Sequence, residues 1–548
     1  MTISEKIIHL RKSAGLSQTQ LAVRLRVSRQ SVSKWEKGES YPQLDKIAAI
    51  CDLFRINANE LIDESVVLNT YQNKAEPQNA ENHYFGTDGF RGESNQVLTA
   101  EHAFKIGRFL GWYFSSPQFA SKRPNEARAK ICIGKDTRRS SYMLEYALCA
   151  GIAASGADAY ILHVTTTPSV SYVTRTENFD CGVMITASHN IFYDNGIKVL
   201  NACGEKMEER ITHLIECYLD GDLPALGLEK ENDLPYAKRA KIGKVVDHVA
   251  GRNRYIGYLI SCSITSFRGL RIGLDCANGA SWYIARSVFS ALGAELHVIG
   301  DHPDGLNTNK DCGSTHIGNL QRLVKEQHLD VGFAFDGDAD RCLAVDENGE
   351  VVDGDKILYI LAKRLRRHGE LKHDMVVSTV MSNSGLAKAF QEEGIQNKQT
   401  KVGDRFVYEE MMKNDFWLGG EQSGHIIIRK YATTGDGVLT AIKLLEEMID
   451  QKSSLAKLGA PVHLYPQVLK NVPVVDKKAV MEDEAVLSLA EKINKQMNGS
   501  GRILLRESGT EPVVRIMAES DDLEECDRHI ETIYRLIQRK GYAYEDHQ

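Results

Sequence analysis

The stretch FAFDGDADR, residues 333–341, places three aspartates at alternate positions directly after an apolar run. Single small residues separate Asp336, Asp338 and Asp340, so a tight turn can bring their carboxylates together. Carboxylates this close repel one another unless a cation lies between them, and such oxygen ligands suit Mg²⁺. The stretch predicts a strand that ends in a magnesium loop. A solvated turn is the alternative, and an EF-hand is disfavoured because Asn348 occupies its glutamate position.

Short β-branched runs alternate with amphipathic segments on both sides of this loop, from residue 84 onward. Such alternation is typical of repeated βαβ units, and 548 residues are too many for a single core. The sequence therefore predicts an α/β protein of several domains, whose ligands bind in loops that follow strands. We expect strands at 129–133, 182–185, 271–275, 295–299, 375–380, 503–506 and 513–517, and helices at 142–154, 282–292, 385–393 and 523–539.

The composition excludes several other classes of protein. The chain is 42% hydrophobic, has no apolar stretch long enough to span a bilayer, and starts without the apolar core of a signal peptide. Its 11 cysteines are scattered without metal-binding spacing. We therefore expect a cytoplasmic protein with reduced thiols and no membrane partner. The net charge of −7 argues against a protein that binds a polyanion with its whole surface, but it does not exclude a small basic module.

Three further loops carry reactive or polar groups. MITASHN, residues 184–190, places Ser188 beside a histidine after an apolar strand, and by itself this stretch is typical of a surface loop. The sequence lacks the G-x-S-x-G motif of a nucleophile elbow, which disfavours a hydrolase. GGEQSGH, residues 419–425, suits either vicinal sugar hydroxyls or a polar hairpin. RESGTEPVVR, residues 506–515, combines arginines, hydroxyls and a glycine turn, and therefore suits a dianion.

Together and in this order, the four loops resemble those of the α-D-phosphohexomutases, from about residue 84 to the end of the chain. FGTDGFRG, residues 85–92, is also similar to that family's opening. The resemblance implies four α/β domains around a central cleft, with one loop from each domain. The expected domains are 83–245 with the serine loop, 246–350 with the metal loop, 351–463 with the sugar loop, and 464–548 with the phosphate loop.

The resemblance also implies the chemistry. Ser188 would be the phosphorylated nucleophile, and a phosphoserine oxygen would join Asp336, Asp338 and Asp340 around one Mg²⁺ per active site. A serine phosphate ester is stable in water, so it can store a phosphoryl group between turnovers. A 1,6-bisphosphate of glucose or glucosamine would then be the expected activator.

Other residues take roles from the same resemblance. Arg91 and Arg341 would lie near the transferring phosphoryl group, and Lys198 and His425 are candidate acid or base groups. The remaining candidates bind the sugar or its nonreacting phosphate. These substrate-binding candidates are Glu421, Ser423, Lys401, His316, Arg506, Ser508, Gly509, Thr510 and Arg515.

Three more strings resemble the phosphoglucosamine mutase branch of this family: residues 303–316, 400–411 and 433–437. The resemblance implies interconversion of glucosamine 6-phosphate and glucosamine 1-phosphate through a phosphoserine and a 1,6-bisphosphate. The alternatives are a phosphoglucomutase or phosphomannomutase with the same mechanism, and a transcription regulator that senses a sugar phosphate.

The chain departs from the family pattern at three positions. Ile191 replaces a usual proline, which predicts a less rigid serine loop, and Lys135 replaces a usual arginine. Glu507 stands where proline is common, and an acid there would weaken phosphate binding unless strand alternation points it away.

Residues 1–65 are expected to form a separate all-α domain, with residues 66–82 as a polar linker. The segment from 15 to 54 resembles Cro/repressor-type helix-turn-helix modules, in which a third helix beginning at Ser28 would bury Val32 and Trp35. The resemblance implies DNA binding; protein docking or dimerisation is the alternative, and such modules often pair as homodimers. The expected DNA contacts are Gln18, Arg29, Gln30, Ser31 and Lys34.

Overall fold

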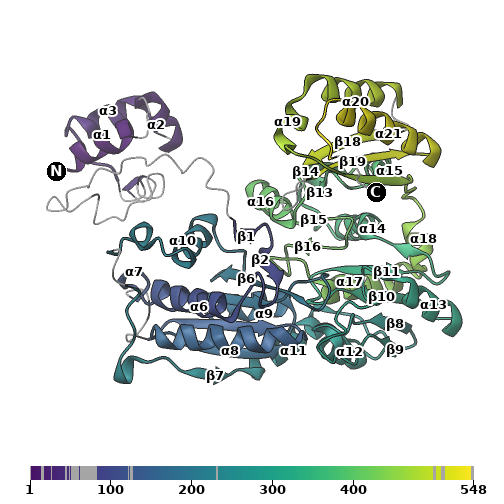
Figure 1. Cartoon of the computed structure of the whole chain (residues 1–548), viewed down its shortest axis with the longest axis horizontal. Helices are drawn as coiled ribbons and strands as arrows, with labels where there is room; N and C mark the ends of the chain where they lie inside the picture. Colours follow the sequence, from purple (N-terminus) through teal and green to yellow (C-terminus); the bar gives the residue numbers. More distant parts are fainter. Residues whose placement is uncertain are drawn as a thin grey trace. The chain divides into compact units, whose positions relative to one another are not determined.

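The chain divides into two compact units, Met1–Glu81 and Asn82–Gln548, in the computed structural model (Figure 1). The structure describes residues 2–13, 18–25, 27–43, 46–47, 50, 61, 83–120, 123, 127–229, 233–497, 501–507 and 513–544.

The N-terminal unit is helical. Its third helix begins at Arg29, one residue after the predicted start, and Ser28 is its N-cap, because the Ser28 side chain accepts a hydrogen bond from the Ser31 backbone N–H at 3.1 Å. Val32 and Trp35 are buried against α1 and α2, which confirms the prediction that they belong to the core. The described helices are α1 (Ile3–Ser13), α2 (Gln18–Leu25) and α3 (Arg29–Glu36).

The second unit begins with a mixed seven-stranded sheet in the order β1-β2-β6-β5-β3-β4-β7. Its strands β5, β3, β4 and β7 are parallel, whereas β6 and β2 run antiparallel to their neighbours. The strands are β1 (Phe85–Gly86), β2 (Gly89–Glu93), β3 (Lys130–Lys135), β4 (Asp158–Val164), β5 (Cys181–Ile185), β6 (Asp194–Asn201) and β7 (Val245–Asp247). The helices of this region are α6 (Ala100–Phe114), α7 (Pro117–Ala120), α8 (Arg139–Ala154), α9 (Thr167–Thr176), α10 (Glu209–Leu219) and α11 (Val249–Cys262), with 3₁₀ turns Leu223–Leu226 and Arg239–Lys241.

Two further βαβ sheets follow. One has the order β12-β11-β10-β8-β9 and the other β14-β13-β15-β16. The strands are β8 (Arg271–Asp275), β9 (Glu295–Ile299), β10 (Val331–Phe335), β11 (Cys342–Val345), β12 (Val351–Val352), β13 (Met375–Thr379), β14 (Gln396–Thr400), β15 (Leu418–Gly420) and β16 (Ile426–Ile428). The helices are α12 (Ser281–Ala291), α13 (Gly318–Gln327), α14 (Gly354–Arg367), α15 (Ser384–Glu393), α16 (Asp404–Asn414), α17 (Gly437–Gln451) and α18 (Leu455–Gly459), with a 3₁₀ turn Lys372–Asp374.

A three-stranded antiparallel sheet, in the order β17-β19-β18, ends the chain and has its own core. The two sheets before it instead share one continuous apolar cluster, in which Phe335 and Leu439 are fully buried. The last elements are β17 (Gln467–Pro473), α19 (Lys477–Glu482), α20 (Glu484–Met497), β18 (Gly501–Glu507), β19 (Val513–Ser520) and α21 (Leu523–Arg539).

The predicted multidomain α/β class is confirmed, and several predicted elements match closely. The strand expected at 271–275 is β8 to the residue, because an apolar run lies there between turn residues. Among the described residues, no helix combines the length and the apolar character needed to cross a membrane.

Candidate active site

Ser188 lies in the loop after β5, where it is 1% exposed. Its backbone φ is 52°, a left-handed conformation that is unfavourable for a serine. Its hydroxyl donates a 2.6 Å hydrogen bond to Oδ2 of Asp336, which follows β10. The loops after two strands from different sheets therefore meet at this oxygen.

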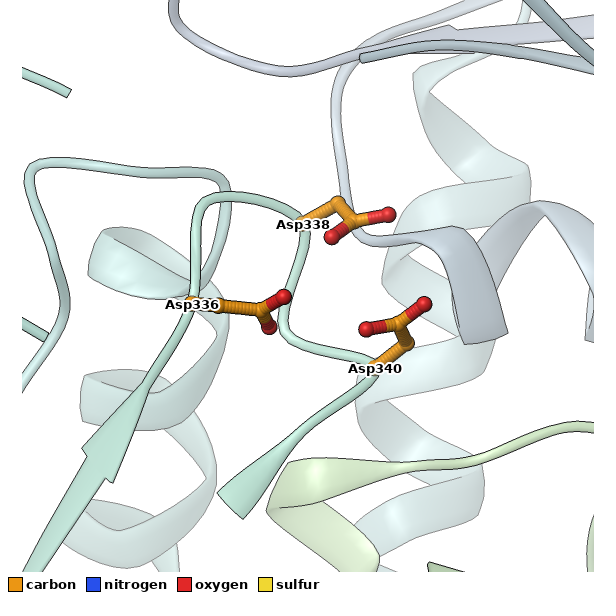
Figure 2. Close-up of side chains that lie close together, drawn as sticks. All are labelled: Asp336, Asp338 and Asp340. Atoms are coloured by element: carbon orange, nitrogen blue, oxygen red, sulfur yellow. The ribbon is translucent and has the colours of Figure 1, made fainter. Parts of the chain in front are cut away.

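The three aspartates after β10 converge as the sequence predicts. Asp336, Asp338 and Asp340 are buried, each offers a carboxylate oxygen within 4.8 Å of the others, and Figure 2 shows the three side chains pointing into one space. Oδ1 of Asp338 and Oδ1 of Asp340 are buried without a hydrogen-bond partner in the described part of the chain. Acceptor atoms left in this way fit a hard cation.

The electrostatics of the cluster lead to the same conclusion. Burial, followed by the charges of Asp340 and Asp338, raises the pKa of Asp336 well above its ordinary value. Burial also raises the pKa of Asp340, but the Lys198 ammonium and His425 outweigh it, so the net shift is strongly downward. The raised pKa of Asp336 shows that a negative charge on this carboxylate is unfavourable beside its neighbours, and a cation bound among them would relieve this cost.

Lys198, a predicted acid/base candidate, lies against this cluster. Its Nζ is 2.9 Å from Asp338, 3.3 Å from Asp340 and 3.2 Å from Asp88. Burial lowers the pKa of Lys198, but the surrounding carboxylates raise it further, so the ammonium form is favoured.

His425, the other acid/base candidate, lies between two carboxylates. Nδ1 is 3.7 Å from Asp340, Nε2 is 3.6 Å from Asp404, and the ring is 3% exposed. Two influences on it oppose each other. Burial lowers the pKa of His425, but Asp340 and Asp404 raise it to about 9, which favours the charged ring. In contrast, the Gly435 N–H donates a hydrogen bond to Nε2 at 3.0 Å, and only the neutral ring can accept this bond. The backbone contact places the proton of the neutral form on Nδ1, facing Asp340.

The two predicted phosphoryl-binding arginines flank the serine. Arg341 donates to Nδ1 of His189 at 2.9 Å, and Arg91 is paired with Asp88. Burial and the two guanidinium charges lower the pKa of His189 to about 3, so this histidine is neutral. A neutral ring leaves the positive charge beside Ser188 to the arginines.

The sugar-loop candidates are placed differently from one another. Oε1 of Glu421 accepts the Gly403 N–H at 3.0 Å, and burial raises the Glu421 pKa. Ser423 follows it on the same turn and is exposed. Lys401 and His316 are exposed, and within the described residues neither side chain forms a hydrogen bond or an ion pair with this cluster.

Arg506 and Arg515 lie opposite each other on the neighbouring strands β18 and β19. Burial and the Arg515 charge lower the pKa of Arg506, as expected for two guanidinium groups that share a site for an anion. Glu507 is exposed and pairs with the buried Val514, so strand alternation separates it from Arg506. The predicted Ser508, Gly509 and Thr510 lie outside the described residues.

Sequence reasoning did not single out a second charged group in the site. Lys206 Nζ is 2.7 Å from Asp404 and 3.3 Å from Asp88, and it joins the first and third sheets. Asp88 and Asp404 both lie within strings quoted above for the family resemblance, so only their individual roles were missed.

Lys135, the departure from the usual arginine, is buried away from these groups. Its Nζ is 2.5 Å from Glu145 of α8, and both side chains are at most 2% exposed. It therefore forms an internal ion pair.

The predicted DNA contacts lie on α2 and α3 of the N-terminal unit. Arg29, Gln30 and Lys34 are exposed on α3, whereas the Ser31 hydroxyl bonds with that of Ser28 at 2.9 Å. Gln18 donates to Glu36 at 2.8 Å. Three of the five candidates thus remain on the exposed face.

Comparisons with known proteins agree with this architecture. Family models described as phosphoglucomutase/phosphomannomutase alpha/beta/alpha domains I, II and III and C-terminal domain match residues 82–222, 253–349, 353–465 and 469–536. A helix-turn-helix model matches residues 7–61. A phosphoglucomutase/phosphomannomutase family protein of Burkholderia thailandensis has a TM-score of 0.68 at 22% identity, covering 84% of this chain and 99% of that one. The N-acetylphosphoglucosamine mutase of Aspergillus fumigatus, solved with GlcNAc-6P and magnesium, has a TM-score of 0.58 at 18% identity, covering 84% and 96%.

Fold and site together define a phosphohexomutase that carries an N-terminal helix-turn-helix module. The phosphoglucosamine mutase of Lachnospira eligens is 58% identical over 460 residues, which are 84% of this chain and 99% of the relative. That of Lachnoclostridium phytofermentans is 53% identical over 459 residues, again 84% and 99%. The chain therefore belongs to the phosphoglucosamine mutase family.

Proposed function

We propose that the chain interconverts glucosamine 6-phosphate and glucosamine 1-phosphate, with Ser188 as the residue that carries the phosphoryl group. The observation that carries the proposal is the buried Ser188 hydroxyl, 2.6 Å from a cluster of three aspartates. The choice of an amino sugar is supported by relatives named phosphoglucosamine mutase at up to 58% identity.

The reaction consists of two phosphoryl transfers. In the first, the bond between Ser188 Oγ and phosphorus breaks and Oγ takes up a proton, while a bond forms from phosphorus to the free sugar hydroxyl, which loses its proton. The sugar 1,6-bisphosphate then reorients, and Ser188 Oγ gives up its proton and takes the phosphoryl group from the other end, whose oxygen regains a proton. Lys198 and His425 are the candidate proton carriers, because both lie against Asp340.

Asp336, Asp338 and Asp340 would hold Mg²⁺, and their buried partnerless oxygens fit that ion. When bound, the ion supplies positive charge next to the transferring phosphoryl oxygens. Arg341 and Arg91 add charge from the protein, while Arg506 and Arg515 bind the phosphate that is not reacting.

A sugar 1,6-bisphosphate is the expected activator, because it can recharge an enzyme that has lost its Ser188 phosphate. The expected location is the cytoplasm. The ten described cysteines are free thiols and nine of them are buried, as in proteins from a reducing compartment.

The test is turnover of glucosamine 6-phosphate by the full chain with Mg²⁺ and a trace of glucose 1,6-bisphosphate, followed by phosphorus NMR. Glucose and mannose 6-phosphates run in parallel. Preferential formation of glucosamine 1-phosphate supports the proposal. A preference for a neutral sugar would select the phosphoglucomutase or phosphomannomutase alternative. No turnover of any sugar, with Ser188 phosphorylated at the start, would contradict the enzymatic proposal and favour the sensor.

A second function is supported by the N-terminal unit. Arg29, Gln30 and Lys34 are exposed on α3, whereas Val32 and Trp35 of the same helix are buried. Exposed basic and amide side chains on such a helix suit phosphates and base edges in a major groove. We propose that this module binds DNA, and a homodimer is the expected form because two modules would contact two half-sites.

Gel-shift with genomic fragments tests DNA binding, with and without glucosamine 6-phosphate. Arg29→Ala in the full chain should weaken binding and reduce its salt dependence. Binding to no fragment would contradict the DNA proposal and leave protein docking as the role of the module.

A further inference from the structure

The left-handed conformation of Ser188 must be maintained by its neighbours, because a serine does not favour a φ of 52°. This backbone angle decides where the hydroxyl points. It therefore decides whether Oγ meets the oxygen of Asp336.

A closed hydrogen-bond circuit surrounds the Ser188 peptide. Its N–H donates to Thr186 Oγ1 at 2.9 Å, and the Thr186 hydroxyl donates to Asp136 Oδ2 at 2.7 Å. The same oxygen accepts Arg138 Nε at 2.8 Å, and Arg138 Nη2 returns to the Ser188 carbonyl at 2.9 Å. All four side chains are at most 1% exposed, so water does not compete for these bonds.

Arg138 also holds the rest of the serine loop. It donates to the carbonyls of Asn190 at 2.7 Å and Asp194 at 3.1 Å, and to that of Ile191. The expected loss of rigidity from the absent proline is thus offset, because the Ile191 carbonyl is bound by a buried guanidinium.

A second donor comes from the region that carries the metal loop. Asn309 is 2% exposed, and its Nδ2 lies 2.7 Å from the carbonyl oxygen of Ser188 and 2.9 Å from that of Asn190. Gly337, between two of the metal-loop aspartates, passes so close that an added Cβ would be 2.5 Å from the Ser188 oxygen. The Ser188 carbonyl is therefore one point where the serine loop and the metal-loop region are joined.

We propose that Arg138 and Asn309 are positioning residues for phosphoryl transfer, which hold the Ser188 peptide so that Oγ faces the aspartate cluster. Neither contacts the serine hydroxyl, so both act through the backbone. The inference rests on the proposed role of Ser188 as the phosphoryl carrier.

The test compares Asn309→Ala with Asn307→Ala in the full chain. Asn307 is the matched control because it lies in the same loop, but its side chain hydrogen-bonds within that loop, to His302 and Asp304. Asn309→Ala should lower kcat by about 10²-fold, since misplacing a reacting group by about 1 Å has that effect. Its KM for glucosamine 6-phosphate should stay within about twofold, because ground-state binding is unchanged. Asn307→Ala should match the wild type.

Conservative variants separate positioning from folding. Asn309→Asp keeps the size but cannot donate, so it should not restore kcat. Arg138→Lys keeps the charge but cannot reach four carbonyls, so it should also lower kcat. Circular dichroism and thermal melting check that each variant folds. An unchanged kcat in Asn309→Ala, or a loss of kcat that follows a lowered melting temperature, would overturn the inference.

One further measurement keeps this inference distinct from the proposed substrate. The rate of Ser188 phosphorylation by glucose 1,6-bisphosphate is followed by mass spectrometry and does not depend on glucosamine turnover. Slower labelling of Asn309→Ala than of Asn307→Ala supports the positioning role even if another sugar proves to be the substrate. Equal labelling rates would overturn it.

Discussion

At the scale of the residue, Ser188 is a weak nucleophile whose reactivity depends on what surrounds it. Its hydroxyl bonds to Asp336, and the pKa of that carboxyl is raised by burial and by two neighbouring aspartates. Arg341 and the neutral His189 lie beside Ser188. The phosphate ester proposed for Ser188 would therefore lie in a site that already holds charged side chains of both signs.

Ser188→Ala should abolish turnover while leaving the fold intact, because the side chain supplies the only proposed phosphoryl carrier. We expect kcat to fall by at least about a thousandfold, measured by phosphorus NMR. A melting temperature close to that of the wild type is the control for folding. Retention of most activity would refute the assignment.

Asp436 provides a second prediction at this scale, from pH dependence. It caps α17 with a 3.0 Å bond from the Leu439 N–H and accepts the Tyr255 hydroxyl at 2.7 Å. Burial raises its pKa from 3.8 to about 6. Asp436 therefore ionises at a lower pH in the unfolded chain than in the folded chain. Its contribution to the free energy of unfolding is fully present below about pH 4 and is lost as the pH rises to 6. The loss approaches about 3 kcal/mol.

Asp436→Asn should remove this loss, because an amide can cap the helix but cannot ionise. The melting temperature of Asp436→Asn minus that of the wild type should therefore increase as the pH rises from 4.5 to 7. Asp522→Asn, at the exposed cap of α21, is the matched control. A difference between Asp436→Asn and the wild type that does not change with pH would contradict the prediction.

At the scale of the element, the site is made where loops after strands of different sheets cross. β5 ends before Ser188 and β10 ends before Asp336, while β18 and β19 carry the two arginines of the proposed phosphate site. β5 and β10 are short and buried, so the loop after each of them starts from a rigid position.

Gly337→Ala should disrupt this crossing, because its Cβ would meet the Ser188 carbonyl at 2.5 Å and Asn309 Nδ2 at 3.1 Å. We expect a loss of kcat of about tenfold or more and a lower melting temperature. Gly318→Ala in α13 is the matched control, since nothing lies within 4 Å of its added Cβ. It should be neutral or stabilising by about 0.5–1 kcal/mol. Equal behaviour of the two variants would contradict the close approach.

At the scale of the whole molecule, two compact units are joined in one chain. The four mutase family matches lie between residues 82 and 536, and the relative from Lachnospira eligens is covered over 99% of its length by 460 residues. The mutase region of this chain therefore corresponds to an essentially complete relative.

A chain that starts at residue 82 should keep kcat and KM within about twofold of the full chain, because the described side chains of the site all lie beyond that point. Steady-state turnover of glucosamine 6-phosphate measures this, and the isolated residues 1–81 serve as the comparison for DNA binding. A large loss of activity would show that the N-terminal unit contributes to catalysis.

Much of the fold follows from local patterns in the sequence. The runs that became β8 and β9, the helix from 523 to 539 and the cap at Ser28 were all predicted, because period and capping depend on neighbouring residues. The types of chemistry were also readable, since the three aspartates and the paired arginines carry their charge wherever they are placed.

By itself, then, the sequence determined several of the helices and strands, the family and the chemical groups of the site. Only the tertiary structure decided that Asn309 bonds to Ser188 across 121 residues, and that Lys198 reaches Asp338 across 140. It also decided that Arg138 binds the loop lacking the usual proline, and that Lys401 and His316 stay exposed. The physical reason is that these contacts depend on how separate sheets pack and on where each loop leaves its strand. No local period or composition records either of these.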